Sequence, residues 1–219
     1  MTTSVAQEKP YSGGVMDRKA HWEKVYNDKA PDEVSWHQDH PTFSLTLIDQ
    51  AGIAPESPVI DVGGGASNLV DHLLDRGFAD VTVLDLAGAA LERARARLGP
   101  RAEQVRWLEA DVTAFEAERT YALWHDRAVF HFLTDPADRA AYLEALRTAL
   151  PVYSHAVVAT FSPEGPEKCS GLPVVRYSPE ELQETLGRGF ALRAVHTETH
   201  RTPQGREQAF QGCLFQRVH

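Results

Sequence analysis

Short apolar runs alternate with helical patterns along most of this chain, and that alternation restricts the folds open to it. Val59–Val62 is an apolar run that leads into three glycines, after which leucine and valine recur at helix spacing. This order predicts a strand, a glycine loop and a helix. Further strands are expected at Val81–Asp85, Gln104–Glu109, Leu123–Trp124 and His155–Phe161, with helices between most of them. Strands joined through helices run parallel, so we expect an α/β fold with one doubly wound, Rossmann-like sheet.

The last part of the chain departs from this pattern. Residues 190–199 and 207–217 are typical of strands, and the turn-forming segment Thr202–Gly205 joins them. Two strands with so short a connection predict an antiparallel hairpin. The hairpin would close one edge of a mainly parallel sheet and bring it to seven strands.

The length and the polar N-terminus suggest a simple domain organisation. Residues 1–16 have no apolar core and are predicted to be a flexible tail. The 219 residues suffice to bury a full core without disulfides or a metal, so residues 17–219 are expected to form one domain. Its N-terminal helices, at about 17–52, are expected to cover the site as a lid.

The charge balance argues against two classes of partner. The chain has 31 Asp and Glu against 22 Lys and Arg, a net charge of −9, and so lacks the basic surface that binds nucleic acid or anionic membranes. Its apolar runs fall far short of the ~20 residues of a membrane span. The two cysteines, Cys169 and Cys213, are too few for a disulfide framework or a thiolate metal site. We expect a cytoplasmic protein, monomeric or homodimeric, that binds neither nucleic acid nor membrane.

The glycine loop after the first expected strand is the leading candidate for a ligand site. In open parallel sheets ligands bind beyond the carboxyl ends of the strands, and glycines let the backbone approach them closely. Asp61 stands two residues before the first glycine, and Asn68 stands where a dinucleotide loop has its third glycine. A carboxylate beside a pyrophosphate is electrostatically poor. It suits a cationic ligand, such as the amino group and sulfonium of S-adenosylmethionine.

Two further acidic residues follow the next strands. Asp85 ends the second strand, where its carboxylate can accept hydrogen bonds from both hydroxyls of a ribose. Asp111 comes just after the third strand and is placed to accept from an adenine amino group. One acid at a strand end is commonly a solvated cap. Three on successive strands favour a nucleoside site.

These segments resemble a known family. VIDVGGGAS, VTVLDLAGAAL and EADVTAF are similar to the first three motifs of class I S-adenosylmethionine-dependent methyltransferases, and the likeness covers about Val59 to Phe215. The resemblance implies the seven-stranded fold and S-adenosylmethionine as cofactor. It also implies the cofactor-binding residues, Asp61, Gly63, Gly64, Gly65, Asp85, Leu86, Asp111 and Val112. One departure is Ser67, which replaces the more usual third glycine.

A narrower likeness concerns the acceptor side. Asp126-Arg127 after the fourth expected strand, and the later Glu164-Gly165-Pro166, resemble the thiol and thiopurine methyltransferase branch, where an Asp-Arg pair borders the acceptor pocket. Similar pairs occur in protein-lysine methyltransferases. The leading expectation is therefore methyl transfer to a small-molecule nucleophile, with a thiol or similar soft acceptor favoured. Protein-lysine methylation, a non-catalytic nucleoside-binding regulatory domain and a nicotinamide-dependent oxidoreductase are the alternatives.

Three consecutive residues are the catalytic candidates. His125 could take a proton from the acceptor near neutral pH, Asp126 could orient it or contact the cofactor, and Arg127 could hold an anionic acceptor group. The alternative is a buried histidine beside a structural ion pair. His131, between two phenylalanines, is expected to pack in the core.

The acceptor is expected to meet residues before the first strand and in the long Pro- and Gly-rich loop after the fifth. The candidates for binding it are Trp36, His37, Phe161, Cys169 and Tyr177. His37 and His40 lack further ligands nearby, so no metal site is predicted. A polar-loop cysteine without a redox role is the preferred interpretation of Cys169.

Overall fold

The computed structural model describes residues 17–30 and 33–219, so the predicted tail at 1–16 lies outside the described residues. Seven strands form the main sheet, in the order β3-β2-β1-β4-β5-β9-β8. They are β1 (Val59–Val62), β2 (Val81–Asp85), β3 (Val105–Glu109), β4 (Leu123–Arg127), β5 (His155–Phe161), β8 (Phe190–Arg201) and β9 (Glu207–Arg217). The first five pair in parallel, and β9 pairs antiparallel with both β5 and β8. The predicted doubly wound sheet with a C-terminal hairpin is confirmed.

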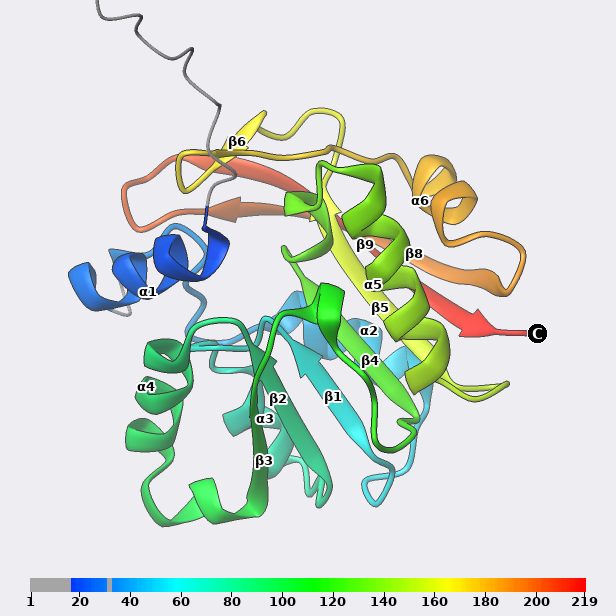
Figure 1. Ribbon diagram of the computed structural model, residues 1–219, viewed down its shortest axis with the longest axis horizontal. Coiled ribbons are helices and arrows are strands. Elements are labelled where there is room, and N and C mark those ends of the chain that lie inside the picture. Colours follow the sequence, from blue (N-terminus) through cyan, green and yellow to red (C-terminus); the bar gives the residue numbers. More distant parts are fainter. Residues whose placement is uncertain (1–16, 31–32) are drawn as a thin grey trace, which may run out of the picture.

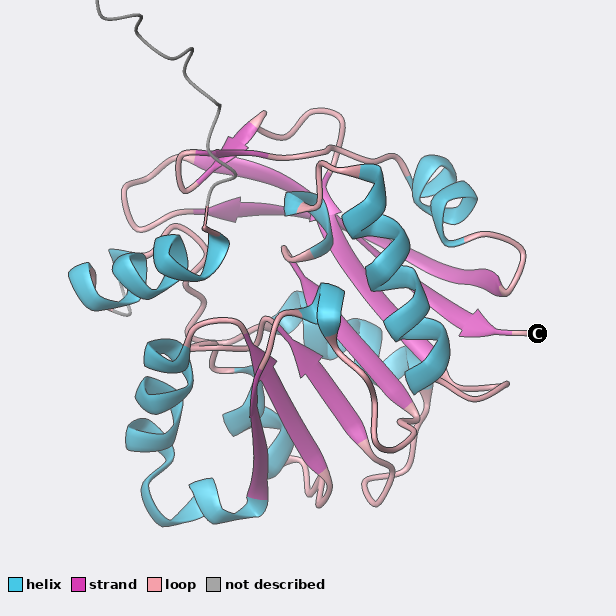
Figure 2. Cartoon of the chain, in the orientation of Figure 1, coloured by secondary structure: helices cyan, strands magenta, loops and turns pink. Residues whose placement is uncertain are grey.

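Helices cover both faces of this sheet (Figures 1 and 2). They are α1 (Arg18–Asp28), α2 (Thr42–Ala51), α3 (Leu69–Asp75), α4 (Gly88–Leu98), α5 (Pro136–Ala149) and α6 (Pro179–Leu186). Short 3-10 turns lie at η2 (Gly99–Gln104), η3 (Val112–Ala114) and η4 (Phe130–Phe132). In Figure 1, α5 lies in front of the sheet, and α2 and α3 lie behind it. Among the described residues, no helix combines the length and apolar character needed to cross a lipid bilayer.

Two hydrophobic cores lie on opposite sides of the sheet. Side chains alternate between the faces of a strand, so Ile60 and Trp124 pack with α5 and α6, whereas Val59 and Leu123 pack with α2, α3 and α4. The short apolar strands are buried on both faces, which is why each reads as a nearly continuous apolar run. This alternation also decides where the polar residues at the strand ends point.

The two N-terminal helices occupy different places. Helix α1 packs against α4 beside the carboxyl ends of the strands (Figure 1). Helix α2 packs instead against β5, β8 and β9, on the face of the sheet. Helix α1 therefore lies beside the expected site and α2 on a face of the sheet, and their action as a lid stays a prediction.

Two local features differ from the expected elements. Strand β4 does not end at Trp124 but continues through Arg127. The loop after β5 contains a small antiparallel pair, β6 (Lys168–Cys169) and β7 (Leu172–Pro173). Polar residues continue β4 because each finds a partner inside the protein, as described below.

Candidate functional site

The site lies where the strand order reverses. Strands β1 and β4 are neighbours, but their connections run to opposite sides, which opens a crevice at their carboxyl ends. Two adjoining cavities occupy it. The main cavity extends from Asp85 and Asp111 to Cys169 and Phe210, and the side cavity lies between the glycine loop and the segment 34–44. Trp36 and Arg127 line both cavities.

The glycine loop lies directly over two carboxylates. A Cβ added to Gly64 would overlap Oδ2 of Asp61, and one added to Gly65 would overlap Oδ2 of Asp85. Gly65 also has a φ of +30°, which residues other than glycine rarely adopt. The loop therefore needs glycine both for its backbone and for the space that the carboxylates occupy.

Asp61 belongs to a buried chain of three polar groups. Asp61 on β1 pairs directly with His125 on β4, and Asp61 Oδ1 lies 2.7 Å from His125 Nδ1. On its other side, His125 Nε2 lies 2.8 Å from Oγ of Ser44, on α2. Asp61 Oδ2 is buried and has no hydrogen-bond partner among the described residues. All three residues line the side cavity, so one carboxylate oxygen there remains free to accept a ligand donor.

The three catalytic candidates do not point in one direction. Because β4 continues through Arg127, His125 points to the α2 face, whereas Asp126 points to the α5 face. Asp126 accepts hydrogen bonds from the Val129 backbone at 2.8 Å and from the Tyr142 hydroxyl at 2.7 Å. Burial raises its pKa to about 6 despite these bonds. Asp126 lines neither cavity, so the expectation of one shared catalytic patch has to be corrected.

Asp85 stands at the end of β2 in the wall of the main cavity, beside Leu86. Its Oδ1 accepts a hydrogen bond from the Ala87 backbone at 2.8 Å. Burial, aided by the nearby charges of Asp61 and Glu23, raises the pKa of Asp85 to about 7. A carboxyl with so high a pKa, open to a cavity, is a mark of functional sites.

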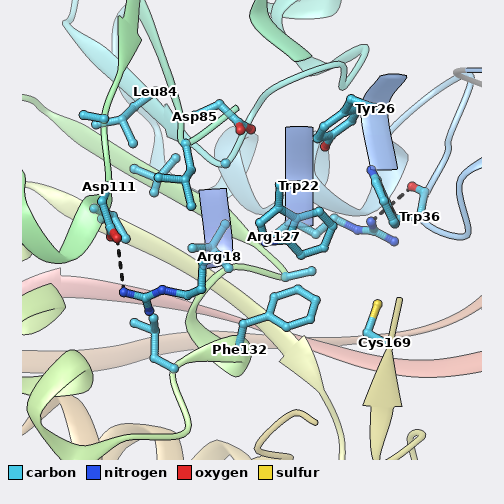
Figure 3. Close-up of a pocket in the computed structure, with 18 of the residues that line it drawn as sticks. Arg18, Trp22, Tyr26, Trp36, Leu84, Asp85, Asp111, Arg127, Phe132 and Cys169 are labelled. Carbon is cyan, nitrogen blue, oxygen red and sulfur yellow. Dashed lines mark hydrogen bonds and ion pairs between the residues drawn. The ribbon is translucent and has the colours of Figure 1, made fainter. Parts of the chain in front are cut away.

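Asp111 and Val112 line the same cavity after β3. The structure shows a partner that the sequence did not reveal, since Arg18 of α1 donates to Asp111 Oδ2 at 3.1 Å (Figure 3). Arg18 also pairs with Asp138 on α5 at 3.0 Å. The guanidinium thereby ties α1 across the cavity edge, and a ligand donor at Asp111 has to share this carboxylate with it.

The candidates for acceptor binding are divided among three places. Trp36 and Cys169 line the main cavity, and His37 lines the side cavity. Phe161 and Tyr177 are buried in the hydrophobic cores and line neither cavity. The last two therefore stand outside the walls of the expected pocket. Side chains from the loop after β5 reach the cavity only through the β6 strand.

Much of the main cavity is walled by aromatic rings, of which the sequence analysis assigned only Trp36 to the site. Trp22 of α1 contacts Trp36 and Phe132 edge to face, with ring centroids 5.6 and 5.1 Å apart. Tyr26 lies one helical turn after Trp22 and packs on Trp36 with centroids 6.0 Å apart. Two aromatic residues four positions apart on an otherwise polar helix could have indicated from the sequence that this face of α1 lines a site. Phe210 of β9 completes the wall.

His131 and the surface histidines have other surroundings. His131 is completely buried against Phe161, and burial lowers its pKa to about 3. His37 pairs with Asp39 at 3.0 Å, and His40 packs on His72. Within residues 17–30 and 33–219 there is no group of three or more His, Cys, Asp or Glu residues able to hold a metal ion.

Part of the chain is similar in sequence to known methyltransferases. Residues 59–151 match the family model described as a methyltransferase domain. The eEF1A lysine and N-terminal methyltransferase of Mus musculus is 25% identical over 96 residues, which are 44% of this chain but only 14% of the mouse protein. The chain thus spans a small part of that relative.

Two solved structures share the fold over most of the chain. One, from work on the conversion of a disulfide bond into a thioacetal group during echinomycin biosynthesis, has a TM-score of 0.73 at 20% identity and covers 91% of this chain and 93% of that one. The other is Burkholderia thailandensis 1,6-didemethyltoxoflavin-N1-methyltransferase with bound 1,6-didemethyltoxoflavin and S-adenosylhomocysteine, with a TM-score of 0.66 at 19% identity, covering 92% and 84%. The methyltransferase domain matched at residues 59–151 and the order of the seven strands thus give the chain the Rossmann-like fold of class I S-adenosylmethionine-dependent methyltransferases.

Proposed function

We propose that the protein transfers the methyl group of S-adenosylmethionine to a small-molecule nucleophile, with a thiol or similar soft acceptor favoured. The observation that carries the proposal is the buried Oδ2 of Asp61 beneath the glycine loop, which has no hydrogen-bond partner in the described part of the chain. A buried carboxylate oxygen without a donor is costly unless a ligand supplies one. The amino group of the cofactor's methionine is such a donor, and it carries the matching charge.

The remaining cofactor contacts follow from the cavity walls. Gly63, Gly64 and Gly65 keep the backbone close to the ligand, and Asp85 is open to the main cavity where a ribose diol would donate to it. Leu86 and Val112 supply apolar walls for a flat base, with Asp111 beside them as an acceptor. The charge and shape of these residues fit a cationic sulfur nucleoside better than a diphosphate.

The bound cofactor supplies an electrophilic methyl group on a positively charged sulfur. The protein's part is to hold the acceptor in line with that methyl group and to exclude water. Positioning of this kind is worth up to about 7–11 kcal/mol. Trp22 packs edge to face on both Trp36 and Phe132 along the cavity wall (Figure 3), and this apolar wall would limit the access of water to the bound methyl group.

In this proposal His125 positions Asp61. Both of its ring nitrogens already have partners, Asp61 on one side and Ser44 on the other. A general base needs a nitrogen within hydrogen-bond reach of the acceptor, and His125 would have to release Ser44 to provide one. Asp126 is likewise proposed as a positioning residue, because its carboxylate holds the backbone that leads from Arg127 to Val129 and Phe130.

A small acceptor is proposed because α1 covers the main cavity and buries Tyr26 against Trp36. The mouse relative is named for a protein acceptor, so product size distinguishes the two classes. Tritium transfer from labelled cofactor into thiols, amines, phenols and cell lysate, followed by separation by size, makes this test. Label that appears only in macromolecules would exclude the small-molecule proposal.

Binding of S-adenosylhomocysteine tests the cofactor site directly. Asp61→Asn keeps the shape of the side chain but removes its charge, and a hydrogen bond to a charged group is worth about 1.5–3 kcal/mol. Calorimetry should therefore show a loss of affinity of roughly 10- to 100-fold for Asp61→Asn. Asp75→Asn, at an exposed carboxyl on α3, is the matched control and should bind like the wild type. Equal affinity in all three proteins would refute the proposed site.

A further inference from the structure

Arg127 is a buried cation between the two cavities. Its side chain is only 10% exposed, and it lines the main and the side cavity at the end of β4. The guanidinium stacks on the ring of Phe210, with Cζ 4.4 Å from the ring centroid. No other described arginine or lysine lines both cavities. Arg127 therefore sets the charge at this end of the crevice.

The hydrogen bonds of this guanidinium are incomplete. Nη2 donates to Glu198 Oε2 and Nη1 to the Trp36 carbonyl, both at 3.4 Å, which is long for such bonds. Nε is buried and has no partner among the described residues. An arginine carries five N–H donors in a planar fork, and a buried charge is stable only when its donors are used. Burial lowers the pKa of Arg127, although Glu198 opposes this effect. Arg127 lines both cavities, so a ligand bound there could supply the missing acceptors.

Glu198 is only a partial counterion. Its side chain is 21% exposed and also accepts a hydrogen bond from Gln38 Nε2 at 2.8 Å. Because Glu198 keeps that second donor, it stays paired when Arg127 turns toward a ligand. The ion pair between Arg127 on β4 and Glu198 on β8 is long, so an anion in the cavity can compete with Glu198 for the guanidinium. The guanidinium would hold such an anion through two parallel, charge-assisted hydrogen bonds.

The surroundings of Arg127 restrict the shape of that anion. In Figure 3, Arg127 lies between Trp22 and Trp36, with Phe132 below, and Asp111 lies at the other end of the cavity. The main cavity thus has carboxylates at the end proposed for the nucleoside and a cation surrounded by aromatic rings at the other. Flat aromatic molecules stack on such rings, and an acidic group on them would meet the guanidinium.

We propose that the acceptor is a flat aromatic molecule with an anionic oxygen group, such as a carboxylate, and that Arg127 binds that group while the aromatic wall holds the ring. This inference rests on the proposed methyl transfer and adds the chemical class of the acceptor. Cys169 lies in the same wall, and its sulfur would be a polarizable neighbour for a soft atom, such as a sulfur, of the acceptor. The alternative, that Arg127 binds the carboxylate of the cofactor itself, is an outcome of the test.

Charge-matched probes test the proposal. Benzoate and 2-naphthoate differ from benzamide and 2-naphthamide mainly in charge, and calorimetry on protein saturated with S-adenosylhomocysteine measures all four. We expect at least one acid to bind at least tenfold more tightly than its amide. Arg127→Met should remove that preference, and Arg127→Lys should retain part of it. Arg201→Met, at an exposed arginine of β8, is the control and should keep the full preference.

A second variant, Glu198→Gln, should strengthen the binding of the acid probes, whereas Arg127→Met should weaken it. Glu198→Gln removes the competing carboxylate, so the acid probes should bind several-fold more tightly, which a purely structural role of Arg127 does not predict. Glu198→Gln also decides the matter if Arg127→Met fails to fold. Acids and amides that bind equally to the wild type, or an Arg127→Met protein that loses S-adenosylhomocysteine but keeps the acid preference, would overturn the proposal. Failure of the wild type to bind S-adenosylhomocysteine would refute the proposed function instead, and the same probes without it would still measure the preference at Arg127.

Discussion

Asp85 should make the stability of the protein depend on pH in an unusual direction. The pKa of this carboxyl rises from its ordinary value of 3.8 to about 7, chiefly because the group is buried and secondly because Asp61 and Glu23 are also acidic. Between pH 4 and pH 7 the folded protein therefore holds a proton that the unfolded chain has lost. The free energy of unfolding must then fall as the pH rises through this range.

The size of the effect follows from the shift. About three pH units correspond to about 4 kcal/mol that the folded state loses by the time the pH exceeds 7. Asp85→Asn keeps the side-chain shape and an oxygen that can accept from the Ala87 backbone, but it cannot ionise. If the two proteins are matched at pH 4.5, where the wild type has already lost about 1 kcal/mol of this total, the variant should exceed the wild type at pH 8.5 by up to about 3 kcal/mol.

Urea denaturation of both proteins at several pH values measures this difference. Subtracting the two curves cancels the titration of groups that the proteins share, including Asp126. The higher stability of Asp85→Asn should be accompanied by weaker binding of S-adenosylhomocysteine, because the ionised carboxylate is the better acceptor for a ribose diol. Calorimetry should show S-adenosylhomocysteine affinity rising with pH through about 7 in the wild type, and a weaker, flatter profile in Asp85→Asn. Stability curves that stay parallel from pH 4.5 to pH 8.5 would refute the reasoning.

Two further predictions concern groups outside the cofactor contacts. Glu23 of α1 accepts hydrogen bonds from the backbones of Gly88 and Ala89, at 2.7 and 3.3 Å, and so caps α4, which has no side-chain cap of its own. Glu23→Gln should weaken this tie by about 0.5–2 kcal/mol and speed hydrogen exchange in α1, and unchanged exchange there would contradict the capping role. His131 has a pKa lowered to about 3 by burial, so the unfolded chain takes up a proton that the folded protein refuses as the pH falls below 6.5. His131→Phe cannot be protonated, and denaturation should show its stability relative to wild type improving by up to about 3 kcal/mol between pH 7.5 and pH 4.5; a constant difference would mean that His131 does not titrate in this way.

The sheet was predictable because its strands are buried on both faces. Val59–Val62 and Val81–Asp85 read as apolar runs for that reason, and the glycines and acids at their ends mark the carboxyl edge. The same rule failed at β4, where only Leu123 and Trp124 look like a strand. The polar residues that follow are buried because Ser44 on α2 and Tyr142 on α5 satisfy them. Those partners are 81 and 16 residues away, and no local pattern connects them.

The two faces of β4 also explain why neighbouring polar residues have separate tasks. His125 reaches toward α2 and holds the carboxylate of the next strand, whereas Asp126 reaches toward α5 and holds the turn that follows. His125 lines the side cavity as well, and Arg127, at the last position of the strand, is the one of the three that lines both cavities. A general base made of all three would need side chains on one side of the sheet, which a strand cannot provide. The geometry therefore favours catalysis by positioning, and Arg127 is the residue of the three that we propose to meet the acceptor.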